Sequence, residues 1–173
     1  TAALQNAFFN GVGYESWENV WGIWNQFTPR DGAALKRSST ILRQFGDFIQ
    51  GGGEWTPHIP VIDSLDSKVY VSEFRDANQA IWLMVNRDRK NDELVQLELS
   101  CDNLSNNMRW FDLYRGIEIE NVICDDISKD APTAVVSISV EAEGYGAVLA
   151  TSAEVNDDFE RFLDTMSNLT TTP

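Results

Sequence analysis

The chain has 173 residues, of which 43% are hydrophobic and 11% aromatic, a composition typical of a globular protein with a buried core. Its 13 basic and 27 acidic side chains give a formal net charge of −14 at pH 7. Because nucleic acids and anionic membrane surfaces are bound by clustered Lys and Arg, this charge argues against both as partners, and no apolar run is long enough to cross a membrane.

The first predicted element is a short buried strand over residues 4–9. The sequence there, LQNAFF, is a short apolar run that ends at the turn-forming pair Asn10-Gly11. Aromatic side chains then recur at spacings of three, four and three residues, which match one face of a helix. These aromatic residues are Tyr14, Trp17, Trp21 and Trp24.

A long helix is predicted next. Thr28 is a suitable N-cap, and Pro29 suits the first helical position because its missing N–H would have no helical partner there. Arg30 and Asp31 are then expected to be charges of the first turn. Apolar residues follow at helical spacing, and the three glycines at 51–53 end the helix.

From residue 63 to residue 151 the hydrophobic period changes from that of a helix to that of a strand. Residues 56–62 contain two prolines and are predicted to form an extended connector before this region. Short apolar runs separated by turn signals, seven in about ninety residues, predict an antiparallel β-sandwich. The runs are SKVYVSEF, AIWLMVNR, LVQLELS, MRWFDLY, IEIENVI, AVVSISVEA and YGAVLATS.

Residues 152–173 are acidic, weakly helical in pattern and threonine-rich at their end. We expect them to be an acidic spacer or linker. The chain is interpreted as a piece of a longer polypeptide, so its expected partners include the remainder of that polypeptide, with domains upstream and downstream.

A lone strand, a loop and one helix cannot form a domain, because the strand would leave its backbone groups unpaired. Residues 1–55 therefore fit the last βα unit of a (β/α)8 barrel. The predicted fold class is α+β, in which this terminal barrel unit is followed by an antiparallel β-sandwich over residues 63–151. The loop over residues 11–25 would then lie at the carboxyl end of a barrel strand, where barrel active sites are built.

Glu15 and Glu18 are the candidates for carboxylate chemistry in this loop. Glycoside hydrolysis uses two carboxylates on opposite sides of the scissile bond, about 5 Å apart in retaining enzymes. Two glutamates three residues apart on a helical turn would lie on the same side of a substrate. We therefore expect one of them to hold sugar hydroxyls, or to complete a catalytic site made elsewhere.

The aromatic residues of the loop have two interpretations. Sugar rings present apolar C–H faces that stack on aromatic side chains, so the loop could form a sugar subsite. Alternatively, the tryptophans form the buried seam of a helix, with only the members at one end touching a ligand. The candidate substrate-binding residues are Tyr14, Glu15, Trp17, Glu18 and Asn19.

No cofactor or metal site is predicted. The single histidine, His58, lies between a proline and an isoleucine and is expected at the surface or at a domain interface rather than as a general base. Cys101 and Cys124 have no second pair of ligands beside them, so they do not form a metal site. They could form a disulfide with each other or be two free thiols. These cysteines and two sequons, at Asn103 and Asn168, favour an extracellular or secretory location without fixing it.

The order of these features resembles the C-terminal part of a TIM-barrel glycoside hydrolase of the clan A-like group, with its C-terminal β-sandwich. FFNGVGYESWENVWGIWN resembles the last barrel strand and loop, and PRDGAALKRSSTILRQFGDFI resembles the closing helix. AIWLMVNR, WFDLYRGIEI and VEAEGYGAVLA resemble strands of the sandwich. In such enzymes the two catalytic carboxylates come from the fourth and seventh strands. The resemblance therefore implies that both lie outside this chain, which alone would be inactive.

Two other functions fit the same sequence. The β-sandwich could be a non-catalytic module that binds carbohydrate or protein, or it could be a spacer between other domains. Proteins of similar layout also occur fused to a sulfatase-modifying-factor-like domain, which would agree with a linker at the end of the chain.

Overall fold

The computed structural model describes residues 2–14, 28–61, 67–100, 108–120, 122, 124–125 and 133–170. The helices are α1 (Ala2–Phe9), α2 (Pro29–Gln44) and α3 (Asp157–Thr170), and a π-helical turn, η1 (Phe48–Gly52), follows α2. The strands are β1 (Glu54–Pro57), β2 (Val69–Arg75), β3 (Gln79–Asn86), β4 (Glu93–Ser100), β5 (Arg109–Asp112), β6 (Ile117–Glu118), β7 (Cys124–Asp125), β8 (Thr133–Val140) and β9 (Tyr145–Thr151).

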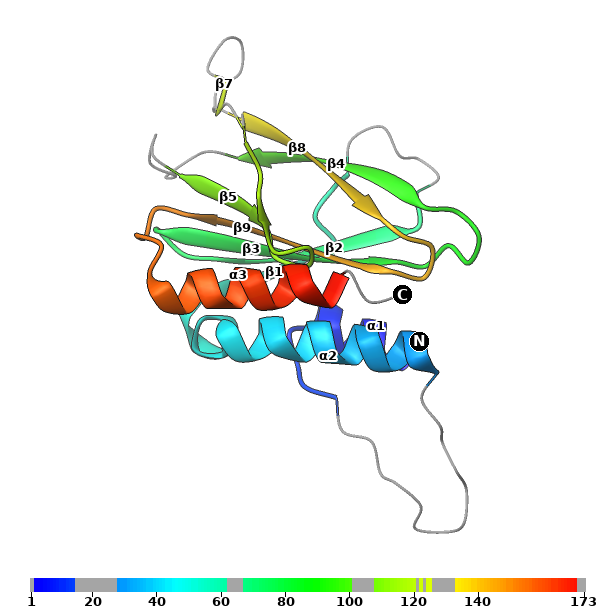
Figure 1. The fold of residues 1–173 in the computed structure, drawn as a ribbon. Helices are drawn as coiled ribbons and strands as arrows, with labels where there is room; N and C mark the ends of the chain where they lie inside the picture. The colour runs from blue at the N-terminus through cyan, green and yellow to red at the C-terminus, as the bar shows by residue number, and fades with distance from the viewer. Residues whose placement is uncertain are drawn as a thin grey trace.

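The strands form two antiparallel sheets. The larger sheet has the order β1-β2-β3-β9-β5-β6, and the smaller has the order β4-β8-β7. The helices lie on one side of the larger sheet, and β4 and β8 lie on its other side (Figure 1). The molecule is therefore a mixed α+β protein with three layers, and the predicted α+β class with antiparallel pairing is confirmed at this level.

The strand β3 is buried on both faces, which explains why its sequence is a continuous apolar run. Ile81 and Leu83 point to the helices, whereas Trp82 and Met84 point to the smaller sheet, and all four are fully buried. β9 divides its side chains between the two cores in the same way. Between the sheets, Trp82 stacks on Trp110 with ring centroids 5.8 Å apart.

The prediction of a strand over residues 4–9 is wrong, because α1 covers this segment. Leu4 and Phe8 are four residues apart, and a helix places both on one face, where they are 5% and 1% exposed. Gln5 is also buried, and its amide Nε2 donates to the carbonyl of Asn86 at 2.8 Å and to that of Gly144 at 3.2 Å. The interpretation of residues 1–55 as a barrel unit stays a prediction, with a helix rather than a strand before the loop.

The predicted spacer over residues 152–173 contains a packed helix. On α3 the apolar residues Phe159, Phe162 and Met166 recur at spacings of three and four, and they are buried in the core beneath the larger sheet. Three of the five acidic residues that suggested a spacer, Asp157, Asp158 and Glu160, occupy the first turn, where negative charge favours the helix N-terminus. Residues 157–170 are thus part of the folded unit.

Candidate functional site

Of the five predicted substrate-binding residues, the structure describes Tyr14. It follows α1 at the start of the predicted loop, and its side chain is 38% exposed. Glu15, Trp17, Glu18 and Asn19 lie outside the described residues, so the predicted roles of these four stay predictions.

The chain reaches Tyr14 through a Schellman turn at the end of α1. The amide of Gly11 donates to the carbonyl of Phe8 at 2.9 Å, and the amide of Val12 donates to the carbonyl of Ala7 at 3.0 Å. Gly11 has a φ of +64°, and a Cβ at this position would lie 2.5 Å from Cγ2 of Ile49. Only glycine fits there without strain, so the direction of residues 12–14 is fixed by local sequence.

Tyr14 lines a pocket of about 250 Å³ between α1, the turn after it and α2. Apolar walls come from Phe8, Leu35 and Leu42, and polar groups come from Arg43 and Gln50. The described residues that line it are Leu4, Ala7, Phe8, Gly11, Val12, Gly13, Tyr14, Leu35, Ser38, Ser39, Leu42, Arg43 and Gln50. None of these lining residues is Asp, Glu, His or Cys, so the described part of the pocket can bind a polar ligand but offers no carboxylate for acid–base work.

The start of α2 agrees with the sequence prediction. The backbone amide of Asp31 donates to Oγ1 of Thr28 at 3.1 Å, and the hydroxyl of Thr28 donates to Oδ2 of Asp31 at 3.1 Å. Pro29 begins the helix. Thr28 is therefore the N-cap, and Asp31 is a first-turn charge as predicted.

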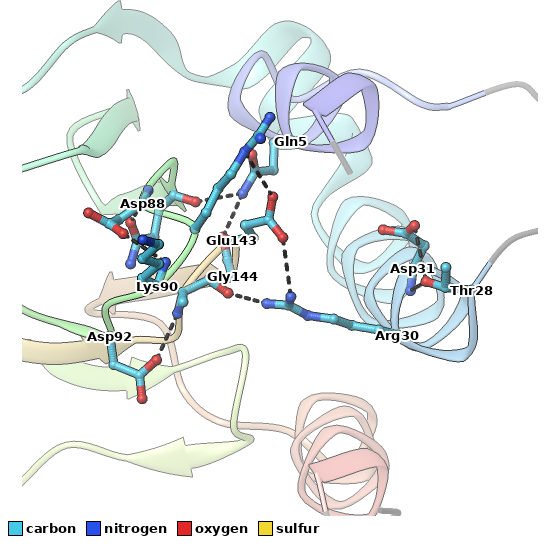
Figure 2. Close-up of polar contacts among 12 residues, drawn as sticks. Gln5, Thr28, Arg30, Asp31, Asp88, Lys90, Asp92, Glu143 and Gly144 are labelled. Carbon is cyan, nitrogen blue, oxygen red and sulfur yellow. Dashed lines mark hydrogen bonds and ion pairs between the residues drawn. The ribbon is translucent and has the colours of Figure 1, made fainter.

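Arg30 does more than provide a first-turn charge. Its guanidinium donates to the carbonyl of Ala142 and pairs with Oε2 of Glu143 at 3.5 Å, which ties α2 to the turn between β8 and β9 (Figure 2). Gln5 reaches the same turn from α1 through Gly144 (Figure 2). The two helices that form the walls of the pocket are thus anchored to one turn of the sheet layer.

The acidic groups next to this turn have structural roles. Oδ1 of Asp88 accepts hydrogen bonds from the amides of Lys90 and Asn91, at 2.8 and 3.1 Å, and Oδ2 accepts one from Nζ of Lys68 at 3.1 Å. The hydrogen bond from the backbone amide of Lys90 is the larger cause, and that from the Lys68 side chain the next, of a pKa of the Asp88 carboxyl well below its usual range. Oδ1 of Asp92 accepts a hydrogen bond from the amide of Ala142 at 2.8 Å. These carboxylates fix the loop between β3 and β4.

The other sequence candidates are placed as follows. His58 is exposed after β1, in agreement with the prediction of a surface histidine. Within the described residues no group of three His, Cys, Asp or Glu side chains is placed to hold a metal ion, and no helix there is both long and apolar enough to cross a membrane. Cys101 and the side chain of Cys124 lie outside the described part, so their pairing stays open.

Two aromatic residues on the surface were not singled out from the sequence. Trp55 on β1 is 45% exposed, and Tyr70 on β2 is 42% exposed. Tyr70 alternates with the buried Val69 and Val71, and this alternation was the signal that it faces away from the core between the sheets. Trp55 is the last residue of the segment that was interpreted as a barrel unit, directly before the predicted connector over residues 56–62, and no periodicity there indicated a strand.

Comparison with known proteins gives partial likenesses only. No family model and no curated protein matches the chain. One similar solved structure is AmyP in complex with maltose, with 14% identity and a TM-score of 0.43 over 79% of this chain and 24% of that chain. Another is an AmyP variant in complex with maltotriose, with 15% identity and a TM-score of 0.42 over 81% of this chain and 24% of that chain. A GH30 endoxylanase from Clostridium papyrosolvens C71 is also similar, with 14% identity and a TM-score of 0.39 over 77% of this chain and 35% of that chain. These neighbours are glycoside hydrolases, and this chain spans about a quarter to a third of their length.

Proposed function

We propose that this chain is the C-terminal portion of a carbohydrate-active enzyme that hydrolyses O-glycosidic bonds, and that residues 11–25 form part of its sugar subsite. The observation that carries the proposal is the position of Tyr14, which is half exposed at a pocket with apolar and polar walls. The candidate residues Glu15, Trp17, Glu18 and Asn19 follow Tyr14 directly in sequence.

The chemistry of the pocket suits a single sugar ring. A pyranose has an apolar C–H face and a rim of hydroxyl groups, so its site needs an aromatic or aliphatic wall beside hydrogen-bonding side chains. Leu35 and Leu42 provide apolar surface, while Arg43 and Gln50 provide donors and an acceptor. A volume of about 250 Å³ is smaller than the pockets of drug-sized ligands and favours one ring over an oligosaccharide.

We assign this chain a part in substrate binding rather than in the cleavage step. The described lining has no carboxylate, whereas glycoside hydrolysis needs two. The two carboxylates would come from the remainder of the polypeptide, with Glu15 or Glu18 holding sugar hydroxyls. A second candidate function is a non-catalytic carbohydrate-binding module, which the same lack of a carboxylate in the described lining favours. Hydrolysis of a glycoside by the longer polypeptide would favour the enzyme over the binding module.

Calorimetric titration of the chain with glucose, galactose, xylose, maltose and cellobiose tests the binding claim. We expect at least one of these sugars to bind and Tyr14→Ala to weaken its binding by about tenfold, because loss of one stacked ring removes about 1 kcal/mol or more. Tyr14→Phe keeps the ring and should retain most of the affinity. Ile117→Ala, an exposed apolar residue on β6, is the matched control. No binding by any of the five sugars, or equal binding by Tyr14→Ala, would overturn the proposal.

A further inference from the structure

A second concave surface lies on the helix side of the larger sheet, next to the C-terminal end of α1. It is a groove of about 610 Å³, which falls in the range of small-molecule sites. We call it the β1–β2 groove. Its lining residues are Asn6, Phe9, Asn10, Trp55, Pro57, His58, Tyr70, Val85 and Arg87.

Trp55 and Tyr70, two exposed rings of the groove, come from neighbouring strands. Tyr70, Ser72 and Phe74 alternate along β2, so they share the face that packs against the helices. Trp55 is paired with Phe74 across the β1–β2 ladder and therefore lies on that same face. The hydroxyl of Ser72 donates to the carbonyl of Phe9 at 2.5 Å, which fixes the end of α1 beside both strands. The rings are thus held on a rigid sheet.

His58 extends the aromatic lining between Phe9 and Tyr70. Its ring centroid lies 5.4 Å from that of Phe9 and 6.1 Å from that of Tyr70. The residue has a φ of +59°, a conformation that costs a non-glycine residue free energy and is often found where a side chain must be aimed at a ligand. The amide of Ile59 donates to the carbonyl of Val71 at 2.9 Å and holds this backbone in place.

The polar lining of the groove is neutral or cationic. Arg87 donates from Nη2 to Oδ1 of Asn6, and Nδ2 of Asn10 donates to the carbonyl of Asn6 at 2.7 Å. No Asp or Glu is among the lining residues that the structure describes, although the chain carries a net charge of −14. A guanidinium without a carboxylate beside it attracts anionic groups and can bind a carboxylate or a sulfate through two N–H groups.

We propose that the β1–β2 groove binds an acidic saccharide unit, a pyranose ring that carries a carboxylate or a sulfate. The apolar face of the ring stacks on Trp55 and Tyr70, and the anionic group pairs with Arg87. Asn6, Asn10 and His58 are within the same groove and supply hydrogen bonds to ring hydroxyls. This site shares no residue with the pocket at Tyr14, so it stands or falls independently of the proposed function.

The test is calorimetric titration of the Tyr14→Ala chain, in which binding at the other pocket is weakened, with trigalacturonate, with a sulfated heparin-derived disaccharide and with neutral maltotriose. We expect at least one of the two acidic sugars to bind at least tenfold more tightly than maltotriose, with affinity falling as salt is raised. The acidic sugar that binds identifies the carboxylate or the sulfate as the recognised group. Binding of neither acidic sugar, or equal affinity for maltotriose, would overturn the proposal.

Variants locate the binding. Trp55→Ala should weaken binding of the acidic sugar by tenfold or more. Arg87→Gln should reduce the ratio of its affinity to that of maltotriose to less than threefold. Val135→Ala, on the outer face of the smaller sheet and 52% exposed, is the matched control, and Tyr14→Ala should leave this site unchanged. Full affinity in Trp55→Ala and Arg87→Gln would place any binding elsewhere and refute the assignment.

Discussion

At the scale of single residues, Gly11 connects the sequence to the candidate site most directly. It ends α1 in a left-handed conformation and lies against Ile49 and Phe74, so it determines how the chain continues to Tyr14. Gly11→Ala should lower the free energy of unfolding by more than about 1 kcal/mol, because both the positive φ and the close contacts oppose a Cβ. Urea denaturation of the purified chain measures this loss.

Gly13 supplies the control for this prediction. It lies two residues further along the same turn, and a Cβ there would meet no atom within 4 Å. Gly13→Ala should therefore change the free energy of unfolding by less than about 0.5 kcal/mol. Equal losses for the two variants would mean that the Schellman turn does not position the loop.

Residue by residue, the sequence pointed to part of the candidate site. Tyr14 was singled out because aromatic spacing marked it, and the N-cap Thr28 was predicted because capping chemistry is local. Trp55 and Arg87 were missed, because they meet only after β1 pairs with β2 and the end of α1 packs beside them. Such a meeting depends on tertiary pairing, which no short window of sequence contains.

At the scale of elements, α3 lies directly against the tight turn between β5 and β6. Gly116 in this turn has a φ of +70°, and a Cβ there would lie 2.3 Å from the carbonyl oxygen of Leu163 on α3. Gly116→Ala should lower the free energy of unfolding by about 2 kcal/mol or more, because the helix must move away or the turn must deform. Thermal or urea unfolding followed by circular dichroism measures the effect.

Gly32 in α2 is the comparison for Gly116. It has ordinary helical geometry, and a Cβ there would meet nothing within 4 Å. Gly32→Ala should stabilise the chain by up to about 1 kcal/mol, since alanine has the higher helix propensity. If Gly116→Ala were equally harmless, α3 would not be docked where the structure places it.

The elements also show why period-based predictions succeeded for strands and failed at α1. The runs around β2, β3, β8 and β9 were found because turn signals separate them and their apolar residues fit a sheet. In α1, six residues of LQNAFF are too few to distinguish a buried strand from a helix. The pairing of Leu4 with Phe8 on one face is decided by the sheet on which they pack.

At the scale of the whole molecule, the larger sheet joins two cores. Its helix side holds α1, α2 and α3, and its other side holds the smaller sheet, with β3 and β9 contributing to both cores. The Tyr14 pocket and the β1–β2 groove both open on the helix side, separated by α1, which lines each of them. A sugar bound at either place should therefore contact residues of α1.

Two-dimensional amide NMR of the chain during titration with glucose, galactose, xylose, maltose and cellobiose tests whether this chain forms a sugar subsite. We expect the sugar that binds to shift the amides of residues 11–14 on one wall of the pocket and of residues 38–43 on the other. The amides of β8 on the outer sheet should stay in place. Shifts confined to residues outside both walls, or no shift with any of the five sugars, would contradict the claim that this chain forms a sugar subsite.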